Sequence, residues 1–184
     1  ILVVTIGHVL YLIRLEQDGR DNINWGTNRG KTIFTSNYIV RWSKSTIEKD
    51  GSILMVGHTH DDFTILYRFT RNGYPDTYFK TNNNDWYTIK TDDTPLTSYI
   101  HDIKHDDINN FYVLAGHEIE NTDTYATVWK LLHDGSVEKY RLTLHPTTRS
   151  TAVKIIIPTT NPDITDDVYV LVQNNYTNSS FEVY

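Results

Sequence analysis

Apolar residues occur along the chain in short runs that are separated by polar clusters. Runs at 53–56, 111–115 and 168–172 are bounded by Asn, Asp, Gly and Thr, and the segments 63–69 and 125–131 show partial alternation of apolar and polar residues. Short apolar runs between turn residues, with a period of two, are typical of β-strands. No segment combines helix caps with a 3.6-residue period. The sequence therefore predicts an all-β fold with a turn about every 8–12 residues.

Three Asx-Gly pairs lie between predicted strands and mark hairpin turns. They are Asp18-Gly19, Asn72-Gly73 and Asp134-Gly135. Glycine adopts positive φ at no steric cost, and an Asx-Gly pair between two strands is the strongest short-range signal for a hairpin. We therefore expect Gly19, Gly73 and Gly135 to be structural turn residues, with primed turns at Gly73 and Gly135.

The dipeptide Gly-His occurs three times, each time after an apolar run. Its glycines are Gly7, Gly57 and Gly116, and each is followed by one of the three turn glycines. Both sets of glycines recur at intervals of about 50–60 residues, and two markers that keep the same order at similar spacing indicate an internal repeat. A fourth repeat begins at 168–172, where Gln173 stands in place of Gly-His. We expect Gly57 and Gly116 to end a strand where the chain bends or approaches a neighbouring repeat.

Each full repeat has room for four antiparallel strands. In the second repeat they are expected at 52–57, 63–70, 76–81 and 98–104, with 86–90 extending one of them or standing between two. Four strands in each stretch of about 50–60 residues are typical of a β-propeller blade. We therefore predict one repeat domain over 1–184, with approximate units 1–48, 49–107, 108–165 and a partial unit 166–184.

The second unit resembles the delta-60 repeat of bacterial and viral β-propellers. The resemblance is carried by 50–57 (Asp-Gly-Ser-Ile-Leu-Met-Val-Gly), by Arg68 in the next strand, and by 72–79 (Asn-Gly-Tyr-Pro-Asp-Thr-Tyr-Phe). The third unit matches at 113–116 and at the Asp-Gly turn, but lacks the Asp-Thr run. The resemblance implies a scaffold or binding module and brings no catalytic residues. Propellers with Trp-Asp repeats also carry Gly-His, but their period is about 40 and no Trp-Asp closes the units here.

Three units and a fraction do not close a ring, because propellers have about 4–8 blades. The sequence therefore indicates an incomplete propeller, and our hypothesis is a segment of a longer propeller-bearing protein.

Composition and charge exclude several classes of protein. The 184 residues include no Cys, which excludes a disulfide scaffold, a zinc ribbon and thiol catalysis. The net charge of −6 argues against a nucleic-acid binder, which needs a basic face. No apolar run approaches the length of a membrane-crossing helix, so no membrane span is predicted. We also predict no cofactor and no metal.

Polar residues follow two of the Gly-His pairs and are the candidate ligand site. They are His58, His60, Asp61 and Asp62 after one pair, and His117, Glu118 and Glu120 after the other. We expect them in loops on one rim of the array, where they form either a polar ligand site, a carboxylate pair for glycan cleavage or a solvated surface. Among the four tryptophans, Trp86 is the best candidate for an exposed aromatic ligand contact, and Trp129 is predicted to be core.

Two further motifs are weak. The run 25–32 (Trp-Gly-Thr-Asn-Arg-Gly-Lys-Thr) has one residue too few between its glycines for a phosphate loop, and 32–35 is predicted to be a strand. The run 101–107 (His-Asp-Ile-Lys-His-Asp-Asp) places its histidines about 13 Å apart on a strand, too far for one ion. We expect a surface turn and a polar outward-facing strand, respectively.

These observations predict a non-enzymatic β-propeller-like structural or recognition module. Its expected setting is a virion, such as a phage tail, or a bacterial or other extracellular surface. Its expected partners are proteins of a larger assembly, with glycans as a further ligand class and no nucleic acid. The alternative is a carbohydrate-binding or glycan-processing propeller.

Overall fold

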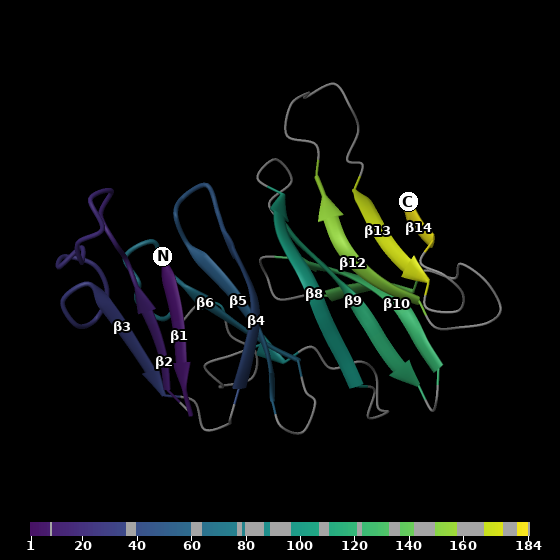
Figure 1. Cartoon of the computed structure of the whole chain (residues 1–184), viewed down its shortest axis with the longest axis horizontal. Coiled ribbons are helices and arrows are strands. Elements are labelled where there is room, and N and C mark those ends of the chain that lie inside the picture. Colours follow the sequence, from purple (N-terminus) through teal and green to yellow (C-terminus); the bar gives the residue numbers. More distant parts are fainter. Residues whose placement is uncertain are drawn as a thin grey trace. The chain divides into compact units, whose positions relative to one another are not determined.

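The computed structural model confirms an all-β fold built from small antiparallel sheets (Figure 1). It describes residues 1–7, 9–35, 40–59, 64–76, 79, 87–88, 97–106, 111–120, 123–132, 137–141, 150–157, 168–174 and 180–183. Within these ranges the regular secondary structure consists of β-strands, and no residue is helical. The same ranges contain no helix with the length and apolar character that a membrane crossing requires.

The strands form four sheets in chain order, here called sheets I to IV. Sheet I has the order β1 (Leu2–Ile6), β2 (Val9–Ile13), β3 (Lys31–Thr35), and sheet II the order β4 (Val40–Ile47), β5 (Ile53–Thr59), β6 (Thr64–Phe69), β7 (Tyr87–Thr88). Sheet III has the order β8 (Thr97–Asp106), β9 (Phe111–Glu120), β10 (Asp123–Leu132), β11 (Val137–Arg141), and sheet IV the order β12 (Ser150–Ile156), β13 (Tyr169–Asn174), β14 (Ser180–Val183).

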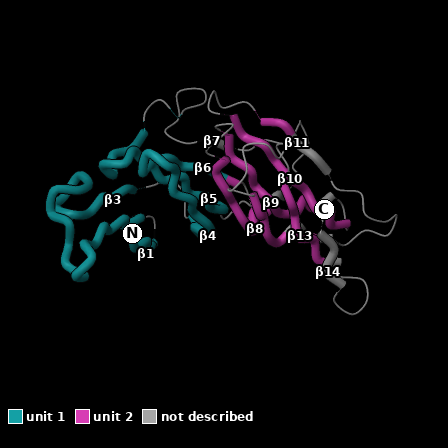
Figure 2. The backbone as a smooth tube through the Cα atoms, turned by 90° about the horizontal axis from the view of Figure 1, so that it is seen from above, with its two compact units in different colours: residues 1–61, 65–88 teal, residues 62–64, 89–184 magenta. Residues whose placement is uncertain are grey.

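The chain divides into two compact units, each with two sheets (Figure 2). Unit 1 comprises Ile1–Asp61 and Ile65–Thr88 and holds sheets I and II. Unit 2 comprises Asp62–Thr64 and Ile89–Tyr184 and holds sheets III and IV.

Each unit has its own apolar core, formed where one sheet face packs on another. In unit 1 the buried core residues are Leu10, Leu12, Trp25, Ile53, Met55, Tyr67 and Phe69. In unit 2 they are Phe111, Val113, Ala115, Ala126, Val128, Ile155, Val170 and Val172. Alternate residues of each strand supply these side chains, as the period of two requires. Trp129 is also fully buried, which confirms its predicted place in the core.

The prediction for the last strand of the second unit is wrong. The segment 98–104 lies in β8, which pairs with β9 and so begins sheet III. The described residues of the predicted strand 76–81, Asp76 and Phe79, belong to no strand. The strand at 32–35 is confirmed as most of β3, whereas β4 and β12 were not predicted.

Three hairpin turns in unit 1 share the same pattern of hydrogen bonds. Gly19 N–H donates to the Glu16 carbonyl and Glu16 N–H to the Arg20 carbonyl. Gly73 N–H donates to the Thr70 carbonyl and Thr70 N–H to the Tyr74 carbonyl. Gly51 N–H donates to the Glu48 carbonyl and Glu48 N–H to the Ser52 carbonyl in the same way, between β4 and β5. The pattern therefore marks a type of turn and not one position of a repeat.

Positive φ is confirmed at both turn glycines, at 84° for Gly19 and 81° for Gly73. The primed turn predicted at Gly73 is wrong, because Arg29 is the only described non-glycine residue with positive φ. The bonds are those of a three-residue loop in which a type I turn is followed by a left-handed glycine. Gly135 lies outside the described residues.

A β-bulge interrupts the first strand of three sheets. It lies between Trp42 and Lys44 in β4, between Ile100 and Asp102 in β8, and between Ala152 and Lys154 in β12. Each of these strands pairs antiparallel with the next strand of its sheet. A bulge adds one residue to a strand, so the alternation of faces shifts at that point.

Gly57 and Gly116 lie beside two of these bulges. Gly57 pairs with Trp42 and Gly116 with Ile100. A Cβ on Gly57 would lie 2.9 Å from the Trp42 ring, and a Cβ on Gly116 would overlap the Tyr99 carbonyl oxygen. Both glycines thus have a close neighbour, but it is the paired strand of the same sheet, and both lie inside a strand rather than at its end. An approach to a neighbouring repeat stays a prediction. Gly7 differs, since it lies in the β1–β2 turn with φ of 59°.

Candidate functional site

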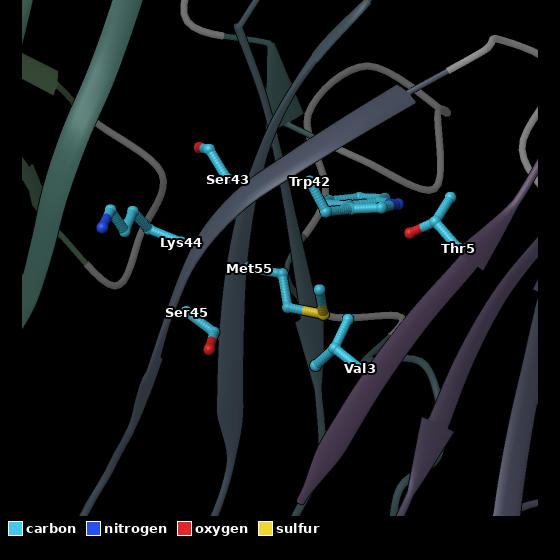
Figure 3. Close-up of a pocket in the computed structure, with 7 residues that line it drawn as sticks. All are labelled: Val3, Thr5, Trp42, Ser43, Lys44, Ser45 and Met55. Carbon is cyan, nitrogen blue, oxygen red and sulfur yellow. The ribbon is translucent and has the colours of Figure 1, made fainter.

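A cavity of about 380 Å³ lies within unit 1, between β1 and the strands β4 and β5 (Figure 3). Its volume is within the range of small-ligand pockets. The residues that line it are Val3, Thr5, Trp42, Ser43, Lys44, Ser45 and Met55. We take this cavity as the candidate functional site, because it brings an aromatic ring, hydroxyls and an ammonium group to one place.

The bulge in β4 sets the arrangement of the lining. Figure 3 shows Trp42 and Met55 extending toward Thr5 and Val3 of β1, whereas Lys44 extends away from them. Trp42 is partly buried and packs against the core of unit 1. The Ser43 hydroxyl lies 3.3 Å from the Val56 carbonyl oxygen, to which it donates. The lining thus combines the apolar side chains of Val3, Trp42 and Met55 with hydroxyls and one ammonium group.

The first group of predicted site residues is mostly untested. His58 lies in β5, opposite Arg41 of β4, and is half-buried. His60, Asp61, Asp62 and Trp86 lie outside the described residues, and their role stays a prediction.

The second group lies in a strand, so its predicted loop position is wrong. His117, Glu118 and Glu120 all belong to β9. Glu118 is fully buried, and the His117 ring stacks on Tyr99 with 5.0 Å between ring centroids. The Nδ1 of His117 is 2.8 Å from Nε2 of His101, in a hydrogen bond that needs a lone pair on one of the two rings. A ligand-binding role for these residues stays a prediction.

The predicted outward face of 101–107 is also wrong in part. Asp102 and Asp106 are buried, at 6% and 5% exposure. Asp102 Oδ2 accepts a hydrogen bond of 3.0 Å from the backbone N–H of Ile155 in β12 and lies 3.2 Å from Lys154 Nζ. This carboxylate therefore joins sheets III and IV. Within the described ranges, no three metal-ligating side chains gather in one place.

Sequence reasoning also missed a buried cluster of charges. The Arg68 guanidinium donates to both carboxylate oxygens of Glu48, each at 2.7 Å, and also to Asp76. The three side chains are only 13%, 5% and 8% exposed. Such a two-pronged pair suits a buried site, because it satisfies several polar atoms at once. Arg68 and Asp76 are among the residues that carry the family resemblance, so that motif here has a structural role.

The glycine-rich run 25–32 joins sheets I and II. The Trp25 Nε1–H donates to the Arg71 carbonyl and the Gly26 N–H to the Asn72 carbonyl, both at 2.8 Å. The Thr32 hydroxyl donates to the Gly73 carbonyl. The Gly26 amide is thus already engaged by protein, which removes one donor that a phosphate loop would need.

With the fold and the cavity described, the chain can be compared with known proteins. The sequence matches no protein-family model, and no curated protein is similar to it.

Proposed function

We propose that this chain is a non-enzymatic, β-propeller-like module that recognises a protein partner within a larger assembly, such as a phage tail or a bacterial surface structure. The delta-60 resemblance of the second unit supports this assignment. The observation that carries it is the hairpin turn repeated at Gly19, Gly51 and Gly73, together with the bulge repeated in three first strands. Recurrent geometry of this kind is typical of repeat proteins, which present extended binding surfaces.

The chemistry of the cavity favours binding over catalysis. Its lining contains one ammonium group and no carboxylate among the described residues, whereas glycan cleavage uses two carboxyl groups. The buried carboxylates of Glu48, Asp76 and Asp102 contact Arg68 or backbone instead. These carboxylates stabilise the sheets.

Cross-linking mass spectrometry on the native assembly tests the proposal. We expect Lys44, which lines the cavity, to cross-link to other protein chains. Lys130 serves as the internal control, because it lies 4.7 Å above the Phe111 ring and 3.6 Å from Glu138 and does not line the cavity. Cross-links from Lys44 that stay within this chain in the native assembly would overturn the proposal.

A carbohydrate ligand is the second candidate, and one observation favours it. Trp42 offers an aromatic face that extends toward the Thr5 hydroxyl (Figure 3), a combination that can stack on and hydrogen-bond to a sugar ring. Calorimetric titration with a panel of oligosaccharides tests this candidate. Trp42→Ala should abolish any binding, while Tyr74→Ala, an exposed aromatic residue elsewhere, should not. Binding that survives Trp42→Ala would exclude the cavity as the sugar site.

A further inference from the structure

We propose that the loop between β2 and β3 is a contact surface for an acidic segment of a protein partner, with Arg29 as its anchor. The loop, residues 14–30, joins two strands that pair with each other. The inference rests on the proposed protein-recognition function and adds a contact outside the cavity. Loops on a rigid scaffold are where binding residues most often lie.

Hydrogen bonds fix the backbone of this loop. Arg14 N–H donates to the Gly30 carbonyl at 3.2 Å, and Asn22 N–H donates to the Arg14 carbonyl at 2.9 Å. Gly30 N–H donates to the carbonyl of Trp25, whose side chain is buried in the core of unit 1. A connection of this length in a compact domain is usually either functional or disordered, and this one is ordered. A preformed loop loses little conformational entropy on binding, so it suits recognition.

Arg29 has a backbone conformation that its side chain disfavours. Its φ is 43° and that of Gly30 is 85°, while Asn28 and Lys31 donate their backbone N–H groups to each other's carbonyls. These are the features of a two-residue type I′ hairpin, whose central positions favour Asn, Asp or Gly because φ is positive. Turn geometry therefore does not account for an arginine at this position. Residues held in such conformations cluster at functional sites.

Two arginines of the loop carry charges that the loop does not pair. Arg14 and Arg29 are exposed, and within the described ranges of the chain neither guanidinium has a hydrogen bond or an ion pair. Arg20 of the same loop differs, since its Nε lies 3.5 Å from Asp18 Oδ2. An exposed guanidinium suits a carboxylate, which it can bind through two parallel hydrogen bonds. The two arginines thus favour an acidic partner.

An exposed apolar side chain lies next to these charges. Ile23 is 67% exposed and follows Asn22, whose N–H donates to the Arg14 carbonyl. A Cβ on Gly30 would lie 2.9 Å from the Asn22 carbonyl oxygen, so the segments at 14, 22–23 and 29–30 are adjacent. Arginine anchors beside apolar contact area are typical of protein interfaces. The partner segment should thus present a carboxylate next to an apolar side chain.

Zero-length cross-linking in the native assembly tests the inference. A carbodiimide joins an amine to a carboxylate that it touches, so Arg29→Lys introduces a reactive group and keeps the positive charge. We expect mass spectrometry to find this amine joined to an Asp or Glu of another protein chain. Arg20→Lys is the matched control in the same loop, because its amine should join Asp18 of its own chain.

A second variant separates recognition from folding. Arg29→Asn removes the charge and introduces a residue that tolerates positive φ, so it should raise the midpoint of thermal unfolding by about 2–4 °C. Its incorporation into the assembly, in competition with the unmodified chain, should fall about tenfold, as expected when an arginine anchor is lost. Arg20→Asn makes the same exchange at an arginine without positive φ and should change neither property.

Two results would overturn the inference. One is an Arg29→Lys amine that joins only carboxylates of its own chain, or none, because Arg29 would then contact no acidic segment of a partner. The other is an Arg29→Asn variant that loses stability or is incorporated as well as the unmodified chain. Either result leaves the Lys44 cross-links of the proposed function intact, so the two failures are distinguishable.

Discussion

The two compact units join their sheets by different polar contacts, although both pack one apolar sheet face on another. In unit 1 three backbone carbonyls of one hairpin loop, at 71–73, accept hydrogen bonds from Trp25, Gly26 and Thr32. In unit 2 a side-chain carboxylate, Asp102, accepts from the backbone of the next sheet. In unit 1 the polar contacts between the two sheets thus depend on the backbone conformation of a turn. In unit 2 they depend on the identity of one side chain, Asp102.

The largest expected effect would disrupt unit 1 alone. Arg68→Leu leaves Glu48 and Asp76 buried without their guanidinium partner, and such a loss costs about 3–5 kcal/mol. Hydrogen exchange resolved by unit should show faster exchange in unit 1. Arg68→Lys keeps the positive charge but loses the planar guanidinium. Its stability should therefore lie between that of the unmodified protein and that of Arg68→Leu. A cost of under about 1 kcal/mol for Arg68→Leu would contradict the structural role of the cluster.

The next effect compares equivalent glycines in the two units. A Cβ on Gly116 meets the backbone of Tyr99, whereas a Cβ on Gly57 first meets the side chains of Val40 and Trp42, which can move. Gly116→Ala should therefore cost about 3 kcal/mol, at the upper end for overpacking, and Gly57→Ala less. Urea denaturation of both variants measures the difference. Equal costs would show that the backbone of β8 yields as readily as the side chains of β4.

A smaller effect tests the carboxylate of unit 2. Asp102→Ala leaves the Ile155 N–H without this acceptor in a buried place, which costs about 1–3 kcal/mol. Asp102→Asn retains an oxygen acceptor and should cost less, because Lys154 is 55% exposed and its ion pair contributes little. Thermal denaturation ranks the two variants. If Asn is as harmful as Ala, the charge rather than the hydrogen bond joins the sheets.

The smallest expected loss of stability comes from alanine at the turn glycines. It separates the cost of the left-handed backbone from the cost of disturbing the contact between sheets I and II. Gly19→Ala places a Cβ in open space at φ of 84°, so only the left-handed backbone opposes it, at about 1 kcal/mol. Gly73→Ala adds contact with the Trp25 ring, 2.7 Å from the new Cβ, and should cost about 2 kcal/mol. Chemical denaturation of the two variants gives the difference. A larger loss of stability for Gly19→Ala than for Gly73→Ala would contradict this prediction.

Most strands could be predicted because their apolar residues either form a continuous run or alternate with polar residues. The strands β4 and β12 could not, and a bulge in each shifts the alternation by one residue. A bulge alone does not hide a strand, since β8 has one and its segment 98–104 was predicted as a strand. The same shift in alternation placed Asp102 on the wrong face, since it follows the bulge in β8.

The candidate site was harder to predict than the strands. Val3 and Thr5 meet 42–45 only when β1 and β4 come together, and no local pattern carries that information. Trp42 was the one available signal, as an aromatic residue in a polar stretch.

The hydrogen bonds to the carbonyls of 71–73 in unit 1 affect which substitutions this loop tolerates. Sheet I contacts the main chain of residues 71–73, so the exposed side chains of Arg71 and Asn72 are free to be replaced without loss of those bonds, whereas the glycine is not. The sequence of this hairpin loop can therefore change at 71 and 72 while its backbone keeps the same bonds to sheet I.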